Sequence, residues 1–195
     1  MKPCTERVLR LQKEVEQEAQ GKMAVHLGCG PMVLTGFLNI DLYHEDKTVI
    51  KTCMSELPFS NNSMDLLYSN HALEHLSLRT GKRALIEWAR VLKPNGKLYL
   101  TIPDLEEICR IMCNPDVPLK SKETWFIYTL FGYQCHTEAD PNDLDVPLDM
   151  GQFHQSGYSK KSITHYLEEA GFTINNLFTF DGFNTPSIWV EATKR

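Results

Sequence analysis

The sequence has few of the features that would place it outside ordinary globular proteins. No apolar run approaches the roughly 18 residues of a membrane-spanning helix. Basic side chains are in the minority, with 20 lysines and arginines against 25 acidic residues and a net charge of −5. Binding to nucleic acid or to an anionic membrane requires a clustered basic surface, so we expect neither as a partner. Because the first residues lack the apolar core of a secretory signal, we also expect a cytoplasmic protein.

Cysteine is scarce as well, with six residues in 195. This number is too small for a disulfide scaffold of this length, and no Cys-x-x-Cys pair is present, so the thiols are predicted to be reduced and packed as small apolar groups. Histidine suggests no metal site either. His71 and His75 share a helical face, but no carboxylate pattern completes a ligand set around them. The sequence therefore predicts no bound metal.

Strand-like and helix-like segments alternate along the chain, which predicts an α/β protein with a mainly parallel sheet. The length corresponds to a single domain, 1–195. Strands are predicted at 23–27, 37–42, 48–52, 64–68, 97–102, 172–180 and 187–192, the last two as an antiparallel hairpin. Helical segments are predicted within 1–22, with Thr5 as N-cap, and at 73–78, 81–92, 104–113, 124–131 and 159–171, with Asp104 and Ser159 as N-caps. The expected fold is Rossmann-like, with a seven-stranded, mostly parallel sheet.

Two segments depart from this alternation. Only residues 31–36 separate the Gly-Cys-Gly turn from the second strand, whereas a parallel crossover usually needs a dozen residues or more. We therefore predict a short loop there in place of a helix. Residues 114–157 combine four prolines with aromatic and acidic clusters, and we predict that this insertion forms a lid over the substrate site.

The first chemical signal is a strand that runs into Gly28-Cys29-Gly30. Glycines at the carboxyl end of a parallel strand let the backbone approach a ligand closely. Asp41 follows eleven residues later at the end of the second strand, where an acidic side chain can accept hydrogen bonds from both hydroxyls of a ribose. Together these positions indicate a cofactor that contains adenosine. The third glycine of a dinucleotide fingerprint is missing, which disfavours a dinucleotide or nucleotide-sugar enzyme.

Further motifs follow in a fixed order, and with them the sequence resembles the class I S-adenosylmethionine-dependent methyltransferases, specifically the compact bacterial-type, methyltransferase-11-like group. The matching segments are 25–30, 39–41, 56–59, 63–68, 71–76 and 90–98, with a later segment at 153–172. Each motif alone is common, but six of them in register are specific.

The resemblance implies S-adenosylmethionine as the cofactor and assigns its contacts. The methionine part would lie against Gly28, Cys29 and Gly30, Asp41 would hold the ribose, and the adenine and sulfonium ends would be bordered by Leu42, Met54, Ser55 and Asn70. Two residues depart from the family pattern. His26 stands where an acidic or polar residue often supports the methionine amine, and Cys53 stands where many members have an aspartate for the adenine amino group.

The reaction that the resemblance implies is in-line transfer of an activated methyl group, for which the enzyme supplies alignment and, for a hydroxyl or ammonium acceptor, a base. His154, then His71 and Tyr158, are the candidate catalytic residues. The predicted function is O- or N-methylation of a small molecule. The alternative is a catalytically degenerate protein that binds S-adenosylmethionine or a nucleoside and acts through a partner.

Overall fold

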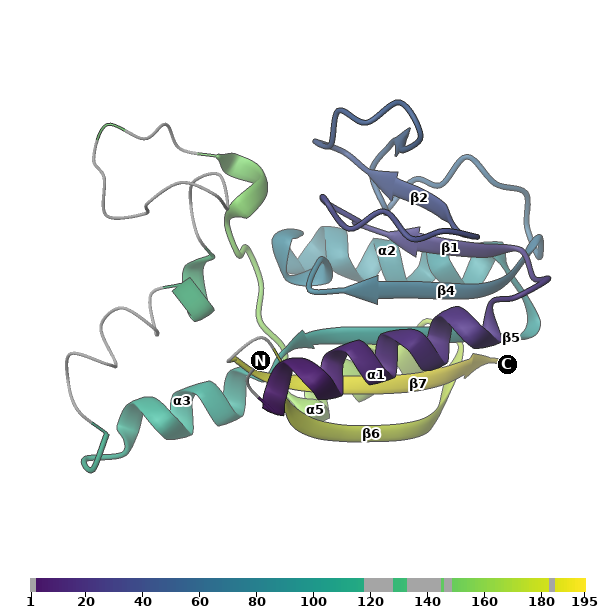
Figure 1. Cartoon of the computed structure of the whole chain (residues 1–195). Coiled ribbons are helices and arrows are strands. Elements are labelled where there is room, and N and C mark those ends of the chain that lie inside the picture. The colour runs from purple at the N-terminus through teal and green to yellow at the C-terminus, as the bar shows by residue number, and fades with distance from the viewer. Residues whose placement is uncertain (1–2, 118–127, 133–144, 146–148, 183–184) are drawn as a thin grey trace.

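Figure 1 shows the computed structural model, which describes residues 3–117, 128–132, 145, 149–182 and 185–195. Its centre is a seven-stranded sheet in the order β3-β2-β1-β4-β5-β7-β6. The strands are β1 (Ala24–Leu27), β2 (Leu38–Asp41), β3 (Ile50–Lys51), β4 (Met64–Asn70), β5 (Leu92–Pro103), β6 (Phe172–Gly182) and β7 (Thr185–Lys194). Neighbours from β3 to β5 pair in parallel, whereas β7 runs antiparallel to both β5 and β6. The predicted Rossmann-like sheet with its C-terminal hairpin is confirmed.

Helices cover both faces of this sheet (Figure 1). On one face lies α1 (Pro3–Glu18), and on the other lie α2 (Leu78–Val91) and α5 (Lys160–Glu169). The short helix α3 (Leu105–Cys113) continues from the end of β5 and extends beyond the sheet. Two 3₁₀ turns, η1 (Leu73–His75) and η2 (Met150–Gln152), complete the elements that the site uses.

Capping explains where three of the helices begin. The side chains of Ser77, Asp104 and Ser159 each accept a hydrogen bond from a backbone N–H in the first turn of α2, α3 and α5. The predicted caps at Asp104 and Ser159 are therefore confirmed. The predicted cap at Thr5 is wrong, because α1 already includes Pro3, a residue that the first turn of a helix tolerates.

The central strands are buried on both faces, and their side chains divide between two apolar layers. Along β4, Leu66 and Tyr68 pack in the layer under α1, whereas Leu67 packs in the layer under α2 and α5. This alternation follows from the period of two in a strand, and burial of both faces explains the nearly continuous apolar run. The run gives way to polar residues at the carboxyl end of β4, which is where the site begins.

The crossover from β1 to β2 is a loop without a helix, as predicted. A side chain from β2 holds it in place. Asn39 accepts a hydrogen bond from Leu34 N at 2.9 Å and donates to Leu34 O at 2.9 Å and Phe37 O at 3.1 Å. Asn39 is buried, so these bonds satisfy loop backbone groups that water cannot reach. The loop is therefore held against β2 without a helix of its own.

The predicted lid can be followed only in part. Within 114–157, residues 118–127, 133–144 and 146–148 lie outside the described residues, and so does most of the predicted helix at 124–131. Residues 128–131 are helical, and Gly132 forms a bridge with Phe153. The assignment of this segment as a lid stays a prediction.

Candidate functional site

A cavity of about 350 Å³ lies at the carboxyl ends of β1, β2 and β4. It is within the range of ligand pockets, and this edge is where open parallel sheets bind ligands. Its lining includes all but one of the predicted cofactor-binding residues, namely Gly28, Cys29, Gly30, Asp41, Leu42, Met54 and Asn70. The exception is Ser55, whose Oγ lies 3.1 Å from the Sγ of Cys53, a lining residue.

Gly28 and Gly30 have similar backbone conformations but different surroundings. Both are left-handed, with φ of 62° at Gly28 and 50° at Gly30. A Cβ at Gly28 would lie 2.4 Å from Cβ of Ala72, so only glycine lets the loop pack against this residue, which precedes η1. A Cβ at Gly30 would meet no protein atom within 4 Å. The close approach of backbone at Gly28 is therefore to the protein itself.

Asp41 joins the loops that follow β1 and β2. Its Oδ2 accepts a hydrogen bond from Gly30 N at 2.8 Å, and its Oδ1 accepts from the backbone N–H groups of Tyr43 at 2.8 Å and His44 at 2.9 Å. A carboxylate has about four lone-pair positions, so these three bonds leave capacity for a further donor. The arrangement fixes the carboxylate at the cavity wall.

Asn70 supplies a buried acceptor without a partner. Its Oδ1 is inaccessible to water and accepts no hydrogen bond from any described residue, although the residue lines the cavity. An unsatisfied buried polar group costs about 1–3 kcal/mol. A ligand with a positively charged or N–H donor at this point would remove that cost.

His26, the first departure from the family pattern, is buried behind the cavity. Its ring stacks on Tyr68 with centroids 5.1 Å apart, and its Nδ1 lies 3.3 Å from Asn39 Oδ1. Burial lowers the pKa of His26 to about 4, against the opposing hydrogen bonds to Asn39 and Met32 and the charge of Asp41. The imidazole is therefore neutral near pH 7 and does not repel a cationic ligand.

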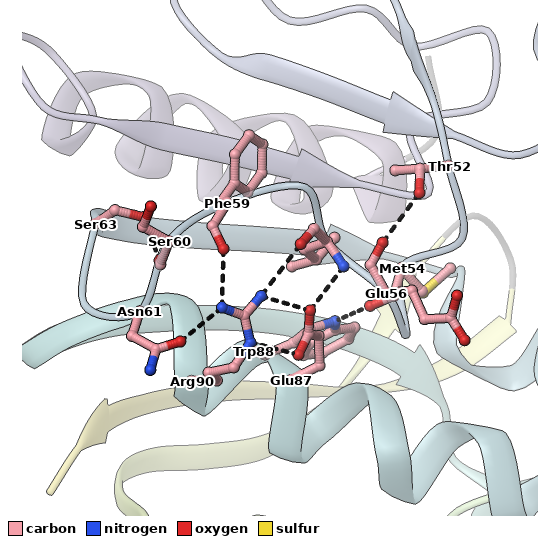
Figure 2. A network of polar contacts seen from close by, with 11 residues as sticks. Thr52, Met54, Glu56, Phe59, Ser60, Asn61, Ser63, Glu87, Trp88 and Arg90 are labelled. Atoms are coloured by element: carbon pink, nitrogen blue, oxygen red, sulfur yellow. Dashed lines mark hydrogen bonds and ion pairs between the residues drawn. The ribbon is translucent and has the colours of Figure 1, made fainter.

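Side chains of α2 fix the loop that contains Met54, one of the residues predicted to border the adenine (Figure 2). Trp88 Nε1 donates to Met54 O at 2.9 Å, and Glu87 accepts from Leu57 N at 2.7 Å. Arg90 pairs with Glu87 and donates to acceptors along the loop, namely Leu57 O, Phe59 O and Asn61 Oδ1. Sequence motifs alone did not identify this network, because its partners lie about 30 residues apart and only one of them was assigned to the site.

The three predicted catalytic residues are separated by the fold. His71 lines the cavity with a left-handed backbone at φ 49°. His154 lines a neighbouring cavity of about 230 Å³. Tyr158 is only 1% exposed, lines neither cavity, and its burial raises the pKa of the phenol. The predicted catalytic role of Tyr158 is therefore not supported by its position.

His71 contacts two side chains. Its Nδ1 lies 3.3 Å from Glu74 Oε1, and its Nε2 lies 3.1 Å from Ser187 Oγ. Burial raises the pKa of Glu74, but contact with His71 and the nearby rings of His75 and His154 outweigh this effect and lower it to about 2. Glu74 is thus a buried, ionised carboxylate beside the cavity.

Comparison with known proteins agrees with this geometry. A sequence profile described as a methyltransferase domain matches residues 37–100. This match spans about a third of the chain and includes the segments after β2 and β4 that contribute to the cavity. No curated protein sequence matches it.

Solved structures share the fold at low sequence identity. An S-adenosylmethionine-dependent methyltransferase from Methanosarcina mazei has a TM-score of 0.60 at 18% identity, covering 89% of this chain and 92% of its own. A protein from Pyrococcus horikoshii has a TM-score of 0.63 at 15% identity, covering 97% and 90%. The Burkholderia thailandensis 1,6-didemethyltoxoflavin-N1-methyltransferase, solved with its substrate and S-adenosylhomocysteine, has a TM-score of 0.57 at 12% identity, covering 97% and 82%.

S-adenosylmethionine, the cofactor that the sequence resemblance implies, would need hydrogen-bond acceptors in this cavity for its ammonium group and its ribose. The unpartnered Oδ1 of Asn70 and the carboxylate of Asp41 are two acceptors among the residues that line it. In the part of the chain that the structure describes, no helix combines the length and apolar character needed to span a membrane.

Proposed function

We propose that this protein is a methyltransferase that transfers the methyl group of S-adenosylmethionine to an oxygen or nitrogen atom of a small molecule. The observation that carries the proposal is the composition of one cavity wall. The cavity is lined by Asp41, Gly30 and Asn70, the expected cofactor contacts, and also by His71 and Gln155, which would face the acceptor. The acceptor would occupy the part of the cavity beside these two residues.

The cofactor supplies an already activated methyl group, so the chain's task is alignment. Asp41 would fix the ribose, and Leu42 and Met54 would flank the adenine. Asn70 would orient the methionine part through its ammonium group. The network from α2 would keep Met54 in place, because Trp88 holds its backbone carbonyl.

We assign the role of general base to His71, ahead of His154. His71 lines the cofactor cavity, whereas His154 lines the neighbouring one. A carboxylate at one ring nitrogen orients an imidazole and stabilises its protonated form, and Glu74 is in this position at Nδ1. An acceptor hydroxyl in the cavity would transfer its proton to the ring of His71 as the methyl group reaches the hydroxyl oxygen.

The test is formation of S-adenosylhomocysteine on a panel of small phenols, alcohols and amines. His71→Asn is the informative variant, because asparagine tolerates the left-handed backbone at this position. We expect turnover to fall by about 100-fold with little change in the KM for S-adenosylmethionine. The increase in rate with pH that a general base causes should also disappear. His165→Ala, on the exposed side of α5, is the control.

Full turnover in His71→Asn would refute the base assignment and return the role to His154. Binding of S-adenosylmethionine without product from any acceptor would favour the degenerate binding protein. A cytoplasmic location and the absence of a nucleic-acid partner stay predictions beside this proposal.

A further inference from the structure

Glu74 is a buried carboxylate that accepts no hydrogen bond from the described residues. It is 1% exposed, and neither of its carboxylate oxygens has a hydrogen-bond partner there. Its Oε1 lies 3.3 Å from Nδ1 of His71, a contact that does not reach hydrogen-bond geometry. Buried charges are normally paired, hydrogen-bonded or bound to a metal, so Oε2 in particular lacks a partner of the usual kind.

Two further imidazoles lie beside this carboxylate with defined tautomers. The rings of His75 and His154 meet edge to face, with centroids 4.8 Å apart. Nδ1 of His75 lies 3.2 Å from Phe153 O, and Nδ1 of His154 lies 3.1 Å from Thr129 O. A carbonyl oxygen only accepts, so Nδ1 carries the proton in both rings and Nε2 keeps its lone pair. Histidines that bind metals show this same arrangement, with the second ring N–H donated to a backbone carbonyl.

We propose that Glu74, His75 and His154 bind a divalent transition-metal ion, for which zinc is the best match. One ligand atom from each residue lies within 4.8 Å of the other two, a separation that small side-chain rotations reduce to that of ligands on one ion. Two imidazole nitrogens and one carboxylate are the donor set of several zinc and iron sites. Magnesium and calcium prefer oxygen ligands and fit the set poorly.

The site would join two parts of the chain that already lie together. His75 belongs to η1, directly after β4, whereas His154 belongs to the segment after η2. The backbone carbonyl of Glu74 accepts hydrogen bonds from Gln155 N at 2.8 Å and Ser156 N at 3.1 Å. His75 lines the cofactor cavity and His154 lines the smaller one, so the ion would hold the wall between them. This proposal does not depend on the methyl acceptor or on the base assignment.

Calorimetric titration of chelator-stripped protein with zinc chloride, in a Cys109→Ser, Cys113→Ser background, tests the proposal. These substitutions remove two exposed thiols on α3 that would compete for zinc. We expect one saturable site, no heat with magnesium chloride, and a visible absorption band when cobalt(II) replaces zinc. His154→Ala and His75→Ala should each weaken zinc binding by at least about 100-fold.

His165→Ala is the matched control. It removes a histidine that also pairs with a glutamate, at 3.4 Å, but on the exposed surface of α5. Unchanged zinc affinity in this control together with the loss in His154→Ala would support the site. No saturable zinc binding, or equal affinity in His154→Ala and His165→Ala, would overturn it. Zinc binding is measured without a methyl acceptor, so its result can be interpreted even if the protein transfers no methyl group.

Discussion

Replacement of Asp41 by alanine would affect both the cofactor and the loops that surround it. In the structure its carboxylate accepts backbone hydrogen bonds from Gly30, Tyr43 and His44 at 2.8–2.9 Å. In the proposed complex the same carboxylate also accepts two hydrogen bonds from the ribose. Asp41→Ala therefore removes hydrogen bonds that hold the loops in the free protein and also a contact with the bound cofactor. Its effects on stability and on cofactor affinity must be measured separately.

The magnitudes follow from the strength of hydrogen bonds to a charged acceptor. Loss of both ribose bonds should cost about 2–3 kcal/mol of binding free energy, which is about a 30- to 150-fold rise in Kd. Loss of the backbone bonds should lower the free energy of unfolding by about 1–3 kcal/mol. Urea unfolding measures the second effect, and calorimetry with S-adenosylhomocysteine measures the first without turnover.

A matched residue and a matched ligand isolate the ribose contact. Asp46 accepts from Thr48 N at 2.7 Å in a similar exposed turn outside the cavity, so Asp46→Ala should leave cofactor affinity unchanged. The 2′-deoxy analogue of S-adenosylhomocysteine should bind about tenfold more weakly than the parent compound to the wild type, and equally well to Asp41→Ala. An equal penalty for the deoxy analogue in both proteins would refute the ribose assignment.

Three further predictions concern the protein around the cofactor. Gly28→Ala should lower the free energy of unfolding in urea by about 1–3 kcal/mol more than Gly30→Ala. Both substitutions strain a left-handed backbone, but only the new Cβ at Gly28 would clash, at 2.4 Å from Cβ of Ala72. Equal losses in the two variants would contradict this. Arg90→Ala should raise the Kd for S-adenosylhomocysteine and lower stability by about 2–4 kcal/mol, whereas Arg110→Ala, in an exposed ion pair, should change neither measurably. The pKa of His26 is about 4 in the folded state and about 6.5 in the unfolded state, so the unfolded state is protonated first as the pH falls. The free energy of unfolding should therefore decrease by up to about 3 kcal/mol between about pH 6.5 and about pH 4. If His26→Gln shows the same pH dependence, another group causes it.

The clash at Gly28 differs from what the Gly-Cys-Gly motif predicts, which is close approach of the backbone to a ligand. The structure places the added Cβ against Ala72 of the protein itself, so the substitution perturbs folding as well as binding.

Much of the fold could be predicted because its determinants are local. Strand alternation, the caps at Asp104 and Ser159, and the Gly28–Gly30 turn with Asp41 eleven residues later are all read over short spans of sequence. The short crossover was predicted from chain length alone. Its cause, the buried side chain of Asn39, became visible only with the loop folded back on it.

The rest could not be predicted because it depends on contacts between distant segments. Glu74 follows His71 closely in sequence, yet the residue that completes its cluster, His154, is about 80 positions away. The position of Tyr158 also depends on contacts between distant segments. Its place in the closing segment suggested a role over the cavity, whereas the fold buries its ring against α2 at Gly81.

The central claim is that the cavity at the carboxyl ends of β1, β2 and β4 binds S-adenosylmethionine through Asn70 and Asp41. Calorimetric titration of S-adenosylmethionine into the wild type and into Asn70→Leu tests it most directly, with NAD as the competing ligand. The account predicts one saturable site for S-adenosylmethionine, a Kd at least about tenfold higher in Asn70→Leu, and no binding of NAD. Saturable binding of NAD without S-adenosylmethionine binding, or the same S-adenosylmethionine affinity in both proteins, would contradict it.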